Sequence, residues 1–357
     1  MLEKIKKYRS VLYPIIIILL VGTAPLLLVE FYGESAKQKI GPEITGIEEW
    51  VNRASPMTIS QQRGKVVIVD FWTYSCINCL RTIPYLNDWQ TKYRDSGLVI
   101  IGIHTPEFAF EKELDRVKSA VETLKIKYSV GLDNQNKTWD AFGNHYWPHK
   151  YFFGSDGTLR FEVVGEGRYE ESEEKIRELL SEAGVEVKKG GIKGEVGEDV
   201  EYQKIKTPEI FFGTFHGGFI GNPKGILSDP NKEYRIPDHL EENAFYLSGR
   251  WKINEQYALH TDRSRGEIRL QYEAKSVNWV AGSNQKEVWV EVMLDHRYLS
   301  PEEAGEDVLI DSQGRSKVLI SQKRLYRIIH NRAGYGRHLL SLSISDSDIE
   351  CYSFTFG

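Results

Sequence analysis

The chain has 357 residues, which is enough for two domains of ordinary size with further segments attached. Its formal net charge is -5, with both signs mixed along the sequence, and this balance argues against a protein that binds nucleic acid or another polyanion. Three cysteines are too few for a scaffold stapled by disulfides, but they suit an oxidising compartment in which two of them react.

The first predicted element is a transmembrane helix over residues 11–29, a stretch without charge that is near the minimum length for crossing a bilayer. Basic residues precede it at Lys4, Lys6, Lys7 and Arg9. Acidic residues follow at Glu30 and Glu34, so we expect residues 1–10 in the cytoplasm and the rest of the chain outside it, in the periplasm or at the cell surface. The alternative is a cleaved signal peptide, with residues 33–36 as a weak cleavage site.

An α/β domain is predicted to follow a polar tether at residues 30–45. Residues 47–57 are expected to lead into this domain as a strand or a helix. The domain's central strand is indicated by a continuous run of β-branched residues, Val66, Val67, Ile68 and Val69. Such a run is typical of a strand that is covered on both faces of a sheet.

Two cysteines stand where this strand gives way to a helix. Downstream of Cys79, apolar residues recur at steps of three and four, at Leu80, Ile83, Leu86, Trp89 and Tyr93. The first N–H groups of a helix have no internal partner and the helix dipole is positive there, so a thiolate is favoured over a thiol at Cys76. We therefore predict that Cys76 is the nucleophile and that Cys79 resolves a mixed disulfide formed on it.

The segment around the cysteines resembles the active-site segment of the thioredoxin fold. Residues 70–72, Asp-Phe-Trp, precede Cys76-Ile77-Asn78-Cys79 at the spacing of that family. The resemblance implies that Asp70 is a buried carboxylate that moves the proton of the second cysteine. It also implies a helix proline, matched by Pro84, and a cis-proline that faces the cysteines, for which Pro148 is the candidate.

The sequence departs from thioredoxin itself at three positions near the site. Ser75 replaces a tryptophan, and Ile77-Asn78 replaces Gly-Pro. These residues are closer to the membrane-tethered TlpA-like branch, and in particular to the soluble part of DipZ-type proteins. Five residues around the cysteines are candidates for contact with the client, namely Trp72, Ser75, Ile77, Asn78 and Trp147.

The cysteine pair also allows two other interpretations, a zinc site and a thiol peroxidase. A zinc site would need two further ligands, but the remaining cysteine, Cys351, is distant and no histidine pair follows at ligand spacing, so we expect neither metal nor cofactor. A thiol peroxidase is suggested by the Thr73-x-x-Cys76 spacing of peroxiredoxins. However, that family has a proline where this chain has Val69.

The rest of residues 46–184 continues the α/β pattern. Buried strands are predicted at 98–103 and 128–132, helices at 114–124 and 138–142, a hairpin at 149–153 and 158–164, and a closing helix at 171–183. Alternating strands and helices imply a parallel sheet with right-handed crossovers. The stretch 128–142 resembles the insertion that distinguishes TlpA-like proteins and peroxiredoxins from thioredoxin.

A linker rich in Lys, Glu and Gly is predicted at residues 185–207, before an all-β domain at 208–357. In this domain the apolar residues alternate, as at Ile268, Leu270, Tyr272 and Ala274, which predicts antiparallel strands in a β-sandwich. The domain resembles the jelly roll, similar to carbohydrate-binding modules, that follows the thioredoxin unit in DipZ-type proteins. A single span stands where those proteins have a multi-helix membrane domain.

The sandwich could bind a sugar or a protein client. Trp251, Trp279 and Trp289 could form a platform for a sugar, although tryptophans in a sandwich are more often core residues, and docking of a protein client is favoured over sugar binding. Cys351 alternates away from Tyr352, so we expect it on the outer face as a free structural thiol.

These observations predict a membrane-anchored, extracytoplasmic thiol-disulfide oxidoreductase. Its partners would be protein disulfides or dithiols, together with a separate electron donor or acceptor in the membrane. The alternatives are a surface protein whose sandwich binds a glycan or a protein, and a thiol peroxidase.

Overall fold

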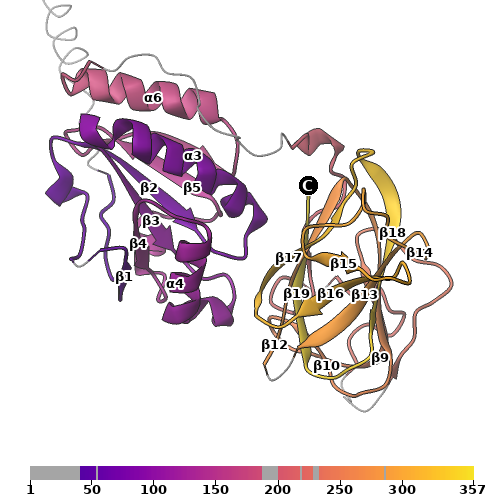
Figure 1. Ribbon diagram of the computed structural model, residues 1–357. Helices are drawn as coiled ribbons and strands as arrows, with labels where there is room; N and C mark the ends of the chain where they lie inside the picture. The colour runs from indigo at the N-terminus through magenta and orange to yellow at the C-terminus, as the bar shows by residue number, and fades with distance from the viewer. Residues whose placement is uncertain (1–40, 54, 187–199, 218, 228–232, 285–286) are drawn as a thin grey trace, which may run out of the picture.

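The computed structural model describes residues 41–53, 55–186, 200–217, 219–227, 233–284 and 287–357, and Figure 1 shows them as an N-terminal α/β unit and a C-terminal β unit. The predicted N-terminus 1–10, the transmembrane span 11–29, the tether up to residue 40 and residues 187–199 of the linker lie outside this description. None of the helices in the described part has the length and apolar character needed to cross a membrane.

The N-terminal unit is built on a six-stranded mixed sheet with the strand order β1-β4-β3-β2-β5-β6. Its parallel centre consists of β2 (Val66–Trp72), β3 (Leu98–His104) and β4 (Ser129–Leu132). Three antiparallel strands complete it, namely β1 (Trp50–Val51), β5 (His149–Phe153) and β6 (Leu159–Val164). The predicted parallel sheet is therefore parallel only in its centre, and the segment predicted at 47–57 contributes just the short strand β1.

Helices cover both faces of this sheet. They are α3 (Ile77–Tyr93), α4 (Leu114–Thr123), α5 (Lys137–Ala141) and α6 (Tyr169–Glu182). All seven residues of β2 are buried. Because side chains alternate along a strand, Val66 and Ile68 pack in the cluster that includes α3, α4 and α6, whereas Val67 and Val69 pack in the cluster bordered by α5.

The C-terminal unit is all β in its described residues, as predicted. Its strands are β7 (Ile210–Phe211), β8 (Glu233–Tyr234), β9 (Phe245–Ile253), β10 (Ala258–His260), β11 (Gly266–Ala274), β12 (Ser276–Ser283), β13 (Val288–Leu294), β14 (Arg297–Tyr298), β15 (Val308–Ile310), β16 (Ser316–Ile320), β17 (Arg324–His330), β18 (Gly336–Ile344) and β19 (Ile349–Phe356).

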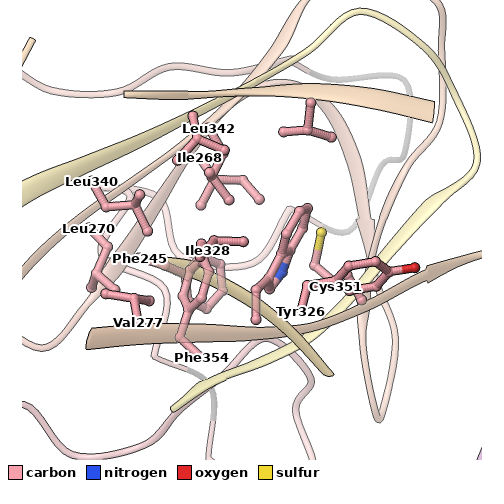
Figure 2. Close-up of a cluster of buried hydrophobic side chains, with 14 of the residues drawn as sticks. Phe245, Ile268, Leu270, Val277, Tyr326, Ile328, Leu340, Leu342, Cys351 and Phe354 are labelled. Atoms are coloured by element: carbon pink, nitrogen blue, oxygen red, sulfur yellow. The ribbon is translucent and has the colours of Figure 1, made fainter. Parts of the chain in front are cut away.

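These strands form two layers that are joined at β9. The first part of β9 pairs with β11 and its last part with β10, and Gly249 lies between them with a φ of 87°. Figure 2 shows the core between the layers, where Ile268 and Leu342 from β11 and β18 approach Val277 and Phe354 from β12 and β19. The strict alternation along β11 follows from this arrangement, since only one face of that strand meets the core.

The tryptophans considered for a sugar platform do not share a surface. Trp251 and Trp279 are buried in the core of the C-terminal unit, whereas Trp289 on β13 is 47% exposed. The core interpretation is therefore confirmed for Trp251 and Trp279, and Trp289 stands apart from them.

The prediction that Cys351 lies on the outer face is wrong. Its side chain is fully buried among the residues of the sandwich core, as Figure 2 shows. The cause is an irregularity in the pairing of β19 with β12, where Val280 pairs with Ser353 but the next residue, Ala281, pairs with Cys351. A bulge of this kind reverses the side-chain alternation, so Tyr352 points away from the core that holds Cys351 and Phe354.

Tyr352 instead packs against the N-terminal unit. Its ring makes edge contacts with Phe108 and Phe110, at centroid distances of 5.1 and 4.6 Å. Both phenylalanines belong to the loop around the short helix η3 (Ala109–Lys112), which follows β3. In the same loop the Ala109 N–H donates to Gln256 Oε1 at 2.9 Å. The two units therefore share a packed interface next to the loop that follows β3.

Candidate redox site

The two cysteines lie at the start of α3, directly after β2. Cys76 caps the helix, and its sulfur accepts a hydrogen bond from the Cys79 N–H at 3.4 Å. Cys76 is half-buried, Cys79 is buried, and both are free thiols. This geometry gives Cys76 partial access to solvent and places the buried Cys79 in the first turn of the helix behind it.

The Trp147–Pro148 peptide bond is cis, as the sequence predicts. The carbonyl of Trp147 accepts a hydrogen bond from the Cys76 thiol at 3.9 Å, so the loop before β5 faces the first cysteine. The Trp147 indole is held by a bond from its Nε1 to the Thr105 carbonyl at 3.0 Å. It also packs on Trp139 of α5, with the ring centroids 4.2 Å apart.

Asp70 lies in the interior of β2, beneath the cysteines. It is 1% exposed, and its Oδ1 has no hydrogen-bond partner within the described part of the chain. Burial raises the pKa of Asp70 to about 7, and the positive charge of Lys150 opposes this rise. A carboxyl group with a pKa near 7 exchanges protons readily at neutral pH.

Lys150 is a site residue that the sequence reading missed. It pairs directly with Asp70 across β2 and β5, and it is fully buried. Its Nζ donates to the Gly165 carbonyl at 2.8 Å. Burial lowers the pKa of Lys150, whereas the charges of Asp70 and Cys79 raise it. The available signal was a lysine inside the aromatic strand His149–Phe153. Lysines are almost never fully buried unless they are paired, so a lysine in such a strand indicates a buried partner of opposite charge.

The Cys79 thiol is electrostatically linked to both of these groups. Burial raises the pKa of Cys79 well above its ordinary value, and the hydrogen bond and charge of Cys76 and the charge of Asp70 raise it further. A thiolate on Cys79 therefore needs a nearby base and a nearby positive charge, and Asp70 and Lys150 provide them.

A second buried carboxyl organises the loops above Cys76. The Glu111 carboxylate accepts bonds from the Ser75 hydroxyl at 2.5 Å and from the N–H groups of Glu107 and Phe108 at 2.6 and 2.9 Å. This residue, which the sequence reading also missed, thus ties the turn before Cys76 to the loop that contacts the C-terminal unit.

The predicted client contacts divide into two groups. Ile77, Asn78 and Trp147 line a cleft together with Cys76. Trp72 and Ser75 are buried and do not line this cleft. Their burial contradicts the prediction that they contact a client: Trp72 packs in the core against His104, and Ser75 is held by Glu111.

No group of three or more His, Cys, Asp or Glu side chains is arranged to hold a metal ion among the residues that the structure covers.

Comparisons with known proteins match both units. Residues 42–162 match the model of the AhpC/TSA family, and residues 207–357 match the model of the thioredoxin-like C-terminal domain. The fold and the cysteine site thus define a thioredoxin-fold protein. More particularly, the chain is similar to thioredoxin-fold proteins of the TlpA and DipZ type.

Two curated relatives and one solved structure illustrate these matches. Protein DipZ of Mycobacterium bovis is 38% identical over 248 residues, which are 68% of this chain and 35% of that protein. The thiol-disulfide oxidoreductase YkuV of Bacillus subtilis is 29% identical, over 40% of this chain and 94% of its own length. The solution structure of a thioredoxin-like protein in the oxidised form is 28% identical, covers 41% of this chain and 97% of its own, and has a TM-score of 0.38. The chain therefore spans about a third of the length of DipZ.

Proposed function

We propose that this protein is a thiol-disulfide oxidoreductase that exchanges disulfides with protein clients through Cys76-Ile77-Asn78-Cys79. The observation that carries the proposal is the arrangement of the two thiols at the start of α3, with the Cys79 N–H bonded to the Cys76 sulfur and Asp70 buried in the strand below. The names of YkuV and of the thiol-disulfide oxidoreductase ResA of Bacillus thuringiensis support the same activity.

The exchange would proceed in two steps from the dithiol form. The Cys76 thiolate attacks one sulfur of a client disulfide, which forms a mixed disulfide and releases the other client sulfur as a thiolate. Cys79 then passes its proton to Asp70, and its thiolate attacks the Cys76 sulfur. The second client sulfur leaves, the protein becomes a Cys76–Cys79 disulfide, and the client has gained two electrons. The reverse sequence oxidises a client dithiol.

Asp70 and Lys150 have separate parts in the second step. Asp70 accepts the proton because its pKa of about 7 allows it to be ionised before the transfer and protonated after it. Lys150 supplies the positive charge that makes a carboxylate tolerable inside the strand. Pro148 and Trp147 present the backbone against which the client would lie beside Cys76.

We further propose that the enzyme acts outside the cytoplasm, anchored by residues 11–29, and that a separate membrane protein supplies or removes its electrons. Support for this comes from the sequence alone, through the uncharged stretch and the basic residues that precede it.

Reduction of insulin disulfides, followed by turbidity, tests the activity. Cys76→Ser should reduce the rate to the background without enzyme, and Cys79→Ser should accumulate a mixed disulfide that is visible by mass. Cys351→Ser is the matched control, because that thiol is buried in the other unit and should leave the rate unchanged. A Cys76→Ser protein as active as the parent would refute the assignment of the nucleophile.

A thiol peroxidase is the second candidate, favoured by the match to the AhpC/TSA family. The position of Thr73 speaks against it, because this side chain is buried and its hydroxyl hydrogen-bonds with His104 Nε2 at 3.3 Å. Peroxide consumption at a rate that exceeds disulfide exchange would favour the peroxidase.

A further inference from the structure

The C-terminal unit and the end of the linker contribute one wall of the cleft at Cys76. The cleft has a volume of about 210 Å³. Cys76, Glu107 and Trp147 line it from the N-terminal unit, and Glu209 and Thr355 line it from the other side. A client disulfide that reaches Cys76 through this cleft passes between the two units.

Two carboxyl groups face each other across this cleft. Glu107 follows β3 and is half-buried, and its backbone is fixed by the bond from its N–H to Glu111. Glu209 precedes β7. Burial and the negative charges of Glu209, Glu111 and Cys76 raise the pKa of Glu107, and burial raises the pKa of Glu209 to about 7. Ionisation of both carboxyls is therefore unfavourable in the empty cleft, and a cationic group between them would relieve their repulsion.

A buried hydroxyl without a partner lies in the same wall. Thr355 on β19 is 8% exposed, and its Oγ1 has no hydrogen-bond partner among the described residues. Buried polar groups are normally paired, so the Thr355 hydroxyl is available to a polar group that a ligand brings into the cleft. A Lys ammonium or an Arg guanidinium carries several N–H donors, which suits a hydroxyl oxygen and two carboxylates.

The cleft continues into a second groove of about 490 Å³, and Glu107 and Trp147 line both. This groove leads to Phe215, whose side chain is 76% exposed. An extended client segment whose cysteine lies at Cys76 could thus run past Glu107 into the groove that leads to Phe215.

We propose that the C-terminal unit selects clients, within the thiol exchange proposed above, that carry a Lys or Arg beside the reacting cysteine in an extended segment. Glu209 and Glu107 receive the cationic side chain, and Thr355 receives one of its N–H groups. This inference rests on the proposed function and adds a substrate class to it.

Two peptide disulfides that differ only in an Arg or a Glu next to the cysteine test the selection. Each is presented to the reduced full-length protein, and its rate is divided by the rate of the same variant with neutral 2-hydroxyethyl disulfide. This division removes any change in the reactivity of Cys76 itself. The parent should prefer the Arg peptide by about tenfold, the effect of one charge-assisted hydrogen bond.

Glu209→Gln keeps the size of the side chain and should lower this preference to about threefold or less, and Glu209→Lys should reverse it. Glu122→Gln is the matched control, because Glu122 is exposed on α4 and does not line the cleft. A parent without preference, or a Glu209→Gln protein that keeps the full preference, overturns the selection while leaving the exchange activity standing. A parent that reacts with neither peptide nor 2-hydroxyethyl disulfide overturns the proposed function, and the selection with it.

Discussion

Replacing Asp70 by Asn should make the protein more stable at alkaline pH, although it removes a proposed catalytic group. Asp70 is buried in the middle of β2, and burial raises its pKa from 3.8 to about 7. The folded chain therefore holds a proton on this carboxyl that the unfolded chain has already released between about pH 4 and pH 7. The free energy of unfolding should fall as the pH rises through that window and stay low above it.

The size of the effect follows from the pKa difference. A shift of about three units, at about 1.4 kcal/mol per unit, gives an upper limit of about 4 kcal/mol for the cost of ionised Asp70. Asn carries no charge at any pH, so Asp70→Asn avoids this cost. We expect the variant to exceed the parent by about 2–4 kcal/mol at pH 8 and to match it closely at pH 4.

Guanidinium unfolding of the reduced protein, followed by tryptophan fluorescence at pH 4, 6 and 8, measures this difference. Asp156→Asn in the turn after β5 is a control of opposite sign. The pKa of Asp156 is lowered by hydrogen bonds from the Thr158 N–H and hydroxyl, so its contribution to stability is present at neutral pH and lost in acid. Equal stabilities of Asp70→Asn and the parent at pH 8 would refute a buried ionised carboxyl, and the proton transfer to Asp70 would lose its basis.

Three further substitutions probe other parts of the structure. Lys150→Met removes the positive charge opposite Asp70, so the pKa of Asp70 should rise. The pH midpoint of the rate of disulfide exchange should then move upward by about one unit, and an unshifted pH profile would contradict this. Tyr352→Ala removes the ring that packs on Phe108 and Phe110 and should lower the free energy of unfolding by about 3 kcal/mol. The two units should then unfold in two separate denaturant transitions, whereas the parent should unfold in a single one. Cys351→Ser buries a hydroxyl in the sandwich core and should lower the free energy of unfolding by about 1–3 kcal/mol. A stability equal to the parent's would contradict this, because it would mean that the hydroxyl is hydrated there.

The parts of the molecule that the sequence predicted well depend on local patterns. The β-branched run at Val66 and the helical repeat after Cys79 define β2 and α3, because each element repeats its own period over several residues. The alternation in β11 likewise reports a strand with one buried face.

The parts that it missed depend on contacts between distant segments. Lys150 lies opposite Asp70 of another strand, and Glu111 binds Ser75 of another loop. The residues that flank Lys150 and Glu111 in the sequence do not identify these partners. Cys351 was misplaced because a single extra residue in β19 reverses the alternation from which its side was inferred. The cleft at Cys76 could not be derived either, since two separately predicted units form its walls.

The aromatic contact between the loop after β3 and Tyr352 has a consequence for any attempt to study the redox unit in isolation. Cutting the chain after Gly184 would expose to water the apolar surface of Phe108 and Phe110 that Tyr352 now covers. The same loop holds Glu111, whose bond to Ser75 supports the turn before Cys76. An excised fragment should therefore be prone to self-association and should have a differently tuned cysteine pair, so potentials measured on it would not describe the parent chain.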